Sequence, residues 1–405
     1  MYSIIRHIEP VVERRARNSK AILLTGPRQV GKSTLFKHLF SSANQVTFDD
    51  DLMLAQASED VGLFLMNNPC PLMIDEVQKC PSIFNRLKIV LDNTDKLSNF
   101  YLTGSQKLQL MENVSDSLAG RISIVELEGL SLREINGVNF NRHFVPTEEY
   151  LSEREKHLKK YGADIWTTIH RGSYPELYAN PEREWVDYYQ SYVKTYLERD
   201  VNKLIKTKNH LTFVRFMTAV AARTGQIINY ANIASELDVS EVTVKEWISI
   251  LEKSGIVYIL KPYTASVLKR AVKTPKLYFF DTGLVAFLTK YSSPEILANG
   301  ALSGHIIENY TVMEIIKSYS NAAKDPLFWY YRDKDNKEVD MIIESDGVLH
   351  PLEIKRSVNP GTELIRAFNV LERSTVPKGV GGIICMRPEL SAVNSENLII
   401  PIWYI

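Results

Sequence analysis

A glycine-rich segment near the amino terminus carries the residue types that bind nucleotide phosphates. In such a loop, backbone N–H groups converge on phosphate oxygens, a lysine adds positive charge, and the hydroxyl of the next residue binds Mg²⁺. Lys32 and Ser33 take these two positions. We predict that ATP and Mg²⁺ bind this phosphate loop, which consists of Gly26, Pro27, Arg28, Gln29, Val30, Gly31, Lys32, Ser33 and Thr34. The alternative is an ordinary glycine-containing turn.

Two acidic residues, Asp75 and Glu76, follow the apolar run Leu72–Ile74. In nucleotide hydrolases of this type, one carboxylate at this place holds Mg²⁺ through water, and the next polarises the attacking water. We therefore assign Asp75 to the metal and Glu76 to catalysis. The alternative is the amino terminus of a helix, where acidic side chains are electrostatically favoured.

Two further polar residues are candidates for catalysis. Ser105 ends the run Tyr101–Gly104, so it would lie beside the same phosphates and sense the γ-phosphate. Arg121 precedes the next apolar run and would stabilise transition-state charge if it reached a phosphate. Reaching the phosphate of a neighbouring subunit would require a homo-oligomer. The alternative for Arg121 is an ordinary surface arginine.

The elements around these residues must bring them together. Ala21–Thr25 is a short apolar run before the phosphate loop, and residues 34–39 after it have a helical pattern. Further runs of strand length alternate with helical segments, near Gln45–Phe48, Leu72–Ile74, Phe100–Thr103 and Ile122–Leu127. This alternation predicts an α/β fold with a parallel sheet covered by helices on both faces. Ligands bind at the carboxyl ends of parallel strands, so the candidate residues should meet there.

A second group of chemically active residues lies in a predicted hairpin, 338–355. Asp346-Gly347 between alternating apolar residues indicates a two-residue turn, which pairs residues whose numbers sum to 693. Asp340 and Glu353 would then face each other. Like charges in this position destabilise a hairpin, and a metal or a shared proton is the usual remedy.

We therefore predict a site for a hard cation with oxygen ligands from Asp340, Glu353 and, on a helix upstream, Glu308. Lys355 points to the same face of the hairpin, where it would stabilise developing phosphorane charge or orient water. Asp340, Glu353 and Lys355 are catalytic in this hypothesis. The alternative is a charged hairpin that faces solvent.

The residue pattern between the two candidate sites predicts mostly helical structure. Residues 141–164 mix acidic and basic side chains at helical spacing, which predicts a solvated helix rather than a nucleic-acid-binding tail. The helical and strand patterns of residues 211–263 predict a winged helix whose third helix spans 241–254. That helix directs Glu241, Glu246 and Glu252 outward, and three carboxylates oppose contact with DNA phosphates. The expected domains are 1–135 (ATPase), 136–205 (helical lid and connector), 206–265 (winged helix) and 266–405 (nuclease-like).

Composition limits the classes of protein that this chain resembles. With 405 residues, 45% of them hydrophobic, and a formal net charge of zero, the chain has no overall attraction to nucleic acid or anionic membrane. Three cysteines without zinc spacing are typical of reduced thiols. Neither a signal-peptide core nor a run of about 20 apolar residues is present. We expect a cytoplasmic protein without membrane attachment.

Motifs along nearly the whole chain resemble one protein family. Beside the phosphate loop they are Ile74–Gln78, Tyr101–Ser105, Leu118–Arg121, Tyr196–Asp200, Phe280–Leu284, Glu338–Asp340 and Glu353–Lys355. They are similar to the divergent AAA-type ATPases of bacteria and archaea and to the uncharacterised domain that follows the ATPase there. In that family the end of the chain resembles the PD-(D/E)-x-K nuclease fold, which implies a nuclease role for Asp340, Glu353 and Lys355. Arg171–Pro175 departs from the Gly-Gly-aromatic-Pro motif of the family.

The sequence therefore favours an ATPase in which ATP hydrolysis gates a nuclease-like module that acts on DNA. The alternative is an ATP-dependent switch that binds a protein or nucleic acid without cleaving it. The intact set Asp340, Glu353 and Lys355 favours cleavage. The acidic third helix of the winged helix and the balanced net charge favour a protein partner.

Overall fold

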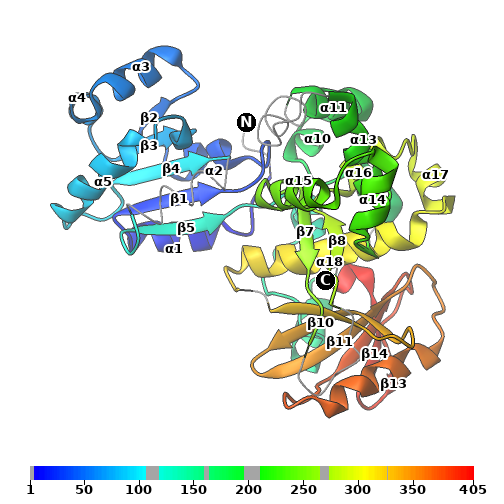
Figure 1. Cartoon of the computed structure of the whole chain (residues 1–405). Coiled ribbons are helices and arrows are strands. Elements are labelled where there is room, and N and C mark those ends of the chain that lie inside the picture. The colour runs from blue at the N-terminus through cyan, green and yellow to red at the C-terminus, as the bar shows by residue number, and fades with distance from the viewer. Residues whose placement is uncertain (1–3, 106–117, 159–163, 196–209, 265–272, 326) are drawn as a thin grey trace.

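The computed structural model has an α/β architecture (Figure 1). It describes all residues except 1–3, 106–117, 159–163, 196–209, 265–272 and 326. The motif Tyr196–Asp200 therefore lies outside the described residues. In the described part of the chain, strands form an amino-terminal sheet, a small central sheet and a carboxyl-terminal sheet.

A five-stranded parallel sheet of order β2-β3-β4-β1-β5 forms the amino-terminal part, as predicted. Its strands are β1 (Ala21–Thr25), β2 (Asn44–Thr47), β3 (Leu72–Asp75), β4 (Phe100–Gly104) and β5 (Ile122–Glu126). Its helices are α1 (Glu9–Arg17), α2 (Lys32–Leu39), α3 (Asp51–Glu59), α4 (Val61–Asn67), η1 (Val77–Lys79) and α5 (Ser82–Asp92). Ile22 of β1 packs in one core with α1 and α2, whereas Leu23 packs in another with α5. Helices therefore cover both faces of the sheet.

A helical region follows the sheet. It contains α7 (Leu132–Ile135), α8 (Glu148–Glu155), α9 (Ile165–Arg171), α10 (Pro175–Ala179) and α11 (Trp185–Tyr192). Three tyrosines of α11, Tyr188, Tyr189 and Tyr192, are buried because their rings pack against Tyr174, the residue that precedes α10. These tyrosines belong to the protein core and are not available to stack on bases.

Three helices and a small antiparallel sheet make up the next unit. They are α13 (His210–Ala221), α14 (Tyr230–Leu237), α15 (Glu241–Lys253), β6 (Gln226–Ile227), β7 (Val257–Leu260) and β8 (Lys276–Phe279), with sheet order β6-β8-β7. Ser240 caps α15 through the Thr243 N–H, and Gly255 follows it with a φ of +69°. The expected domain boundary at residue 265 falls between β7 and β8, which pair in one sheet.

The carboxyl-terminal part is a mixed six-stranded sheet of order β13-β14-β12-β11-β10-β9. Its strands are β9 (Phe328–Arg332), β10 (Glu338–Ser345), β11 (Val348–Ile354), β12 (Gly381–Cys385), β13 (Ser391–Asn394) and β14 (Asn397–Pro401). Its helical segments are α16 (Thr282–Leu288), α17 (Pro294–Asn299), α18 (Ser303–Asn321), η3 (Thr362–Arg373) and η4 (Ile402–Tyr404). Ser345 pairs with Val348 and Met341 with Leu352, so the predicted two-residue turn and its register are confirmed.

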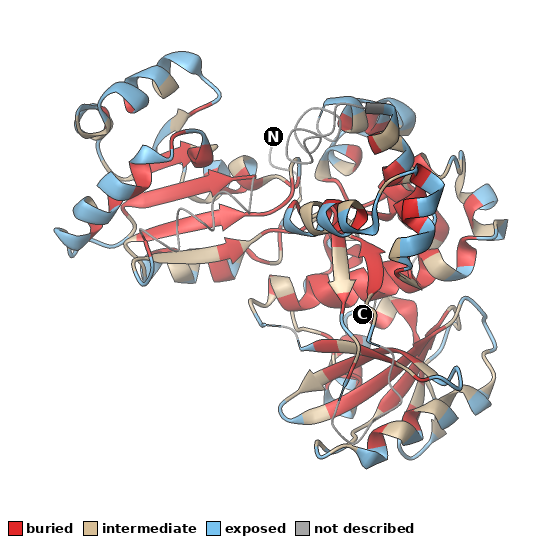
Figure 2. Ribbon diagram, in the orientation of Figure 1, coloured by how far each residue is buried: buried red, intermediate tan, exposed pale blue. Residues whose placement is uncertain are grey.

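Helix α18 lies at the centre of the molecule. Sixteen of its nineteen residues are buried, and it appears almost wholly red in Figure 2. Burial around the whole helix means that other elements pack against each of its faces. The segment after β5, the small central sheet and the carboxyl-terminal sheet all contact α18. No helix among the described residues has the length and apolar character needed to cross a membrane.

Candidate functional site

The phosphate loop joins β1 to α2 at the carboxyl end of the parallel sheet. Its backbone has positive φ at Gly26 (142°), Gln29 (65°) and Gly31 (94°). A Cβ on Gly26 would lie 2.1 Å from the carbonyl oxygen of Leu127, so only glycine fits there. These constraints turn the loop sharply between strand and helix, as a phosphate cradle requires.

Lys32 points back into the phosphate loop. It is buried, and its Nζ donates to the carbonyl oxygens of Gly26 (3.0 Å) and Pro27 (2.7 Å). Burial lowers the pKa of Lys32 to about 8, although the charges of Glu76 and Asp75 oppose this shift. The ammonium is therefore held at the loop by carbonyl groups that phosphate oxygens can replace.

Ser33 and Asp75 meet at the end of β3. The Ser33 Oγ donates to the Asp75 Oδ1 at 2.7 Å, and Thr103 of β4 also donates to this oxygen. A hydroxyl and a carboxylate that converge in this way are the hard oxygen ligands that Mg²⁺ prefers. These residues fit the predicted metal. Sequence reasoning missed Thr103, although its place at the end of a parallel strand was a usable signal.

Glu76 and Ser105 lie together beside this pair. The Ser105 Oγ donates to the Glu76 Oε1 at 2.9 Å, and Gln78 donates to the other carboxylate oxygen. Glu76 has a φ of +54°, a conformation that few residues other than glycine adopt and that is concentrated at functional sites. Two donors thus hold the carboxylate next to Asp75. Ser105 was expected to face the γ-phosphate, but in this structure it contacts Glu76.

Arg121 lies away from the phosphate loop. It comes just before β5, and Ile122 of β5 pairs with Ala21 at the amino end of β1, whereas the loop follows the carboxyl end. Its guanidinium binds both carboxylate oxygens of Asp92, at 2.6 and 3.1 Å, on the protein surface. The structure therefore does not bring Arg121 to the nucleotide site of its own chain.

Elements far along the chain contact the phosphate loop. The Tyr188 hydroxyl of α11 donates to the Gln29 Oε1 at 2.6 Å. A Cβ on Gly255, at the end of α15, would lie 2.8 Å from the Pro27 Cγ, and a Cβ on Gly31 would lie 3.9 Å from the Pro175 ring. The phosphate loop therefore packs against α10, α11 and Gly255 after α15.

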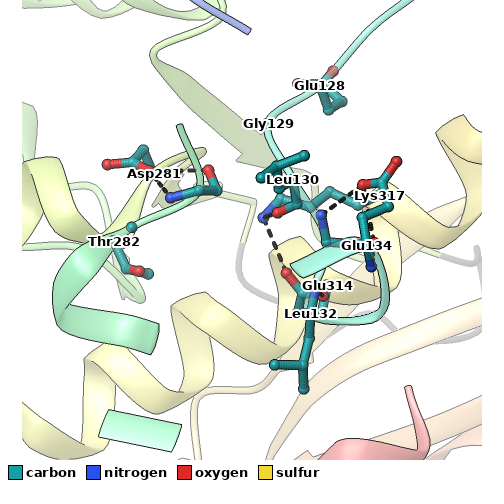
Figure 3. Close-up of polar contacts among 12 residues, drawn as sticks. Glu128, Gly129, Leu130, Leu132, Glu134, Asp281, Thr282, Glu314 and Lys317 are labelled. Carbon is teal, nitrogen blue, oxygen red and sulfur yellow. Dashed lines mark hydrogen bonds and ion pairs between the residues drawn. The ribbon is translucent and has the colours of Figure 1, made fainter. Parts of the chain in front are cut away.

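The segment after β5 is tied to α18 and α16 (Figure 3). The Lys317 Nζ donates to the carbonyl oxygen of Leu130 (2.9 Å), and the Leu132 N–H donates to Glu314 (2.7 Å). Asp281, which caps α16, accepts from the backbone N–H and the hydroxyl of Ser173. The nucleotide domain is thus bonded to the centre of the molecule through buried polar groups.

The second predicted site, in the hairpin β10–β11, has an unexpected member. Lys276 of β8 directs its Nζ to Glu308 Oε1 (2.8 Å), Glu338 Oε1 (2.6 Å) and Asp340 Oδ1 (3.3 Å). On the other side, the Lys355 Nζ lies 2.5 Å from Glu353 Oε1 and 3.6 Å from Asp340 Oδ2. We call these six residues the acidic cluster: Lys276, Glu308, Glu338, Asp340, Glu353 and Lys355.

Burial and ion pairing set the protonation of the acidic cluster. Burial and the charge of Asp340 raise the pKa of Glu353 to about 8, and burial raises that of Glu308 to about 7. Burial also opposes ionisation of Asp340, but the ion pairs with Lys276 and Lys355 outweigh it and lower its pKa. Asp340 is thus the carboxylate that the two lysines keep charged.

The acidic cluster differs from the arrangement expected for a metal between Asp340 and Glu353. The residues are brought together as predicted, with Glu308 beside them, but two lysine ammoniums neutralise the carboxylates. In the described part of the chain, no group of three or more His, Cys, Asp or Glu side chains has the arrangement of metal ligands. The side chains as placed do not fit a divalent cation, because an ammonium stands among them.

Comparison with known families divides the chain into three parts. Residues 18–136 match the family model of an AAA domain. The match supports a divergent P-loop ATPase of the AAA type. Residues 162–295 and 303–405 match two domains of unknown function, DUF8612 and DUF4143.

Curated relatives extend over most of the chain. An uncharacterized protein of Mycobacterium tuberculosis, Rv2008c, is 29% identical over 350 residues, which cover 86% of this chain and 73% of the relative. The uncharacterized protein Mb2031c of Mycobacterium bovis matches to the same extent. The uncharacterized protein MJ1637 of Methanocaldococcus jannaschii is 24% identical over 303 residues, 66% of this chain and 62% of the relative.

Among solved structures, the Walker-type ATPase PABY2304 of Pyrococcus abyssi has a TM-score of 0.40 and 15% identity, covering 69% of this chain and 94% of its own. A signal transduction ATPase with a tetratricopeptide repeat sensor from Pyrococcus horikoshii has a TM-score of 0.25 and 11% identity, covering 76% of this chain and 46% of its own. Both scores are below 0.5, which is too low to establish a shared overall fold.

Proposed function

We propose that the protein is a Mg²⁺-dependent ATPase that works as a switch, in which the nucleotide changes the contacts of the phosphate loop with α11 and α15. The observation that carries this proposal is the hydrogen bond from Tyr188 to Gln29, together with the close approach of Pro27 to Gly255. The Lys32 ammonium has three hydrogens and donates two of them to the carbonyls of residues 26 and 27, so it can also bind a phosphate oxygen. A phosphate bound there would lie next to both contacts.

The residues of the phosphate loop and the end of β3 have distinct roles in this proposal. Backbone N–H groups of residues 26–34 and the Lys32 ammonium bind the phosphates. Ser33 and Asp75 hold Mg²⁺, which neutralises charge on the β- and γ-phosphates. Glu76 orients the attacking water and takes up its proton. Ser105 positions Glu76 through the hydrogen bond at 2.9 Å.

Replacing Glu76 with glutamine should leave ATP bound and slow its hydrolysis by about 10²-fold or more, because the general base is lost while the phosphate contacts stay. Steady-state turnover and equilibrium binding of ATP measure the two effects separately. Glu59→Gln, an exposed glutamate at the end of α3, is the matched control. Loss of binding in proportion to turnover would instead assign Glu76 a structural role.

The surface of α15 favours a protein as the partner of the switch. Its exposed charged residues are Glu241, Lys245, Glu246, Glu252 and Lys253, as the sequence predicts. A helix that inserts into the major groove must approach phosphates, and three carboxylates repel them. DNA binding that depends on α15 would contradict this choice. Salt-dependent binding of duplex DNA to the ATP-loaded protein tests it.

Removal of the Tyr188 hydroxyl should reduce the effect of bound ATP on the dynamics of α11. In the wild type, ATP is expected to slow amide exchange in α11, because the ordered phosphate loop holds Gln29 against Tyr188. In Tyr188→Phe this effect should fall by at least about half, since one charge-free hydrogen bond contributes about 1 kcal/mol. The control is Tyr178→Phe, whose hydroxyl donates to the Gly172 carbonyl instead. An unchanged ATP effect in Tyr188→Phe would remove this contact from the switch.

Nuclease activity gated by ATP is the second candidate function. It is favoured by the position of Lys355, whose ammonium lies within ion-pair distance of both Asp340 and Glu353. Mg²⁺- or Mn²⁺-dependent cleavage of linear, circular and single-stranded DNA, with and without ATP, tests it. A role for Arg121 at the site of a neighbouring subunit is also a proposal, and it requires an ATP-dependent homo-oligomer that light scattering would detect.

A further inference from the structure

The position that a divalent cation would need in the acidic cluster is held by a lysine. The Lys276 side chain is only 2% exposed, and its ammonium lies within 3.3 Å of oxygens from Glu308, Glu338 and Asp340. The ammonium meets three carboxylates from two elements, one on α18 and two on β10. Magnesium or manganese would need oxygen ligands at about 2.0–2.2 Å around the same centre. Ammonium and metal exclude each other there.

The backbone fixes Lys276 in this place. Asn309 of α18 bonds both backbone groups of Phe279 on β8, accepting from its N–H at 2.7 Å and donating to its carbonyl at 2.8 Å. Lys276 itself pairs with Leu260 of β7 and Ile227 of β6. Because β8 is the central strand of its sheet and is clamped to α18, the ammonium is held among the carboxylates.

The acidic cluster nevertheless keeps one free ligand position. Glu353 is buried, with a side chain 8% exposed, and its Oε1 contacts Lys355. Its Oε2 is buried and has no hydrogen-bond partner. A buried carboxylate oxygen without a partner is costly and needs an explanation, such as an ion or a proton. This oxygen is where a further cation contact would form if the centre were open.

The formal charges of the acidic cluster are consistent with Lys276 occupying the place of a divalent cation. Four carboxylates, Glu308, Glu338, Asp340 and Glu353, face Lys276, Lys355 and, on the outer side of Glu338, Arg332. With all four carboxylates ionised, loss of the Lys276 charge would leave two more negative than positive groups. That excess equals the charge of one divalent cation, and the ligands are the hard oxygens that Mg²⁺ and Mn²⁺ select.

We infer that Lys276 is an internal cation that takes the place of a catalytic metal, so that the native acidic cluster excludes Mg²⁺ and Mn²⁺, and that a neutral residue at position 276 converts it into a divalent-cation site. The ligands of that site would be the carboxylates that surround the ammonium, Glu308, Glu338 and Asp340, with Glu353 beside them as a further ligand. The inference is independent of ATP hydrolysis, because it concerns a cluster with no phosphate-loop residue. It assigns the carboxyl-terminal module a binding or structural role in place of metal-dependent cleavage.

The test measures Mn²⁺ binding without nucleotide, in a Lys32→Ala background that weakens binding of any residual ATP. Loss of the electron paramagnetic resonance signal of free Mn²⁺ gives the number of ions bound per chain. The protein with Lys276 should bind no Mn²⁺ that depends on Glu353. Lys276→Met should bind about one ion per chain, and adding Glu353→Gln should abolish that binding. A Glu353-dependent Mn²⁺ site in the protein that retains Lys276 would overturn the inference.

A matched control separates the cation site from simple loss of a buried lysine. Lys317 is also buried and pairs with Glu314 at 3.0 Å, outside the acidic cluster. Lys317→Met should gain no Mn²⁺ binding. Lys276→Gln, which retains hydrogen-bonding capacity, is the second variant. A folded Lys276→Met or Lys276→Gln protein that binds no Mn²⁺ would contradict the second half of the inference. If neither folds, the protein with Lys276 still decides the first half.

Discussion

Replacement of Lys32 with alanine should lower ATP turnover by on the order of 10³-fold, because it removes the positive charge that faces the β- and γ-phosphates. The effect is large here because Asp75 and Glu76 lie close enough to Lys32 to influence its pKa. Without the ammonium, these carboxylates repel the incoming phosphates. Turnover and ATP affinity of the purified variant are the measurements, and undiminished turnover would refute the phosphate-loop interpretation.

The same substitution should not damage the fold, and this serves as its control. Folding lowers the pKa of Lys32 from its ordinary value to about 8, so the native state binds this proton less tightly than the unfolded state. At pH 7 the charged lysine therefore opposes folding, and the opposition fades as pH rises from about 8 towards the unfolded value. We expect nucleotide-free Lys32→Ala to melt no lower than the wild type at pH 7. A lower melting temperature would mean that the loop needs its ammonium for stability.

The phosphate loop was predictable because its residues are local in sequence. Gly26 and Gly31 mark the backbone turn, and Lys32 and Ser33 follow at fixed spacing. Asp75 was also predictable, since a parallel sheet brings strand ends to one edge. The same rule argues against a catalytic role for Arg121 at the nucleotide site of its own subunit. A residue that precedes a parallel strand lies at the amino edge of the sheet, opposite the edge where the phosphate loop lies. The sequence signal was present for that conclusion too.

The acidic cluster was only half predictable. The turn Asp346-Gly347 fixed the register and thus the approach of Asp340 to Glu353. Lys276 lies 32 residues from Glu308 and 64 from Asp340, on a strand of another sheet. No local pattern reports that β8 packs on α18, because the clamp from Asn309 to Phe279 is a tertiary contact. The register of the hairpin β10–β11 gives no information about Lys276, because this counter-ion comes from β8 in another sheet.

Asp340→Asn shows how Lys276 reverses an expectation. From the sequence, two facing carboxylates predict that removing one preserves or raises the stability of the metal-free protein. In the structure, Asp340 is 4% exposed and accepts from the Ile354 N–H (2.9 Å) and from Lys276 and Lys355. Asparagine would lose the ion pairs with the two lysines, which keep Glu308, Glu338 and Glu353 as partners. We now expect a loss of about 1.5–3 kcal/mol in the free energy of unfolding.

The pH dependence of stability gives a second readout of the same change. The pKa of Asp340 is lower in the folded state than its ordinary value of 3.8, so its ion pairs stabilise the fold above that value. That stabilisation is lost as pH falls through the folded pKa. The wild type and Asp340→Asn should therefore differ most near neutral pH and converge in acid. Chemical denaturation at pH 7 and at pH 3 in EDTA measures the difference.

Asp346→Asn is the matched control, because it makes the same chemical change on the same hairpin. Asp346 is exposed at the turn with a φ of +51°, a conformation that asparagine adopts readily, so its stability should change by less than about 0.5 kcal/mol. In EDTA, Asp340→Asn should melt well below both the wild type and this control, and Mn²⁺ should shift none of the three through Glu353. If Asp340→Asn instead melts above the wild type in EDTA, repulsion between Asp340 and Glu353 outweighs the two lysines. The metal site predicted from the hairpin register would then be the better account of the acidic cluster.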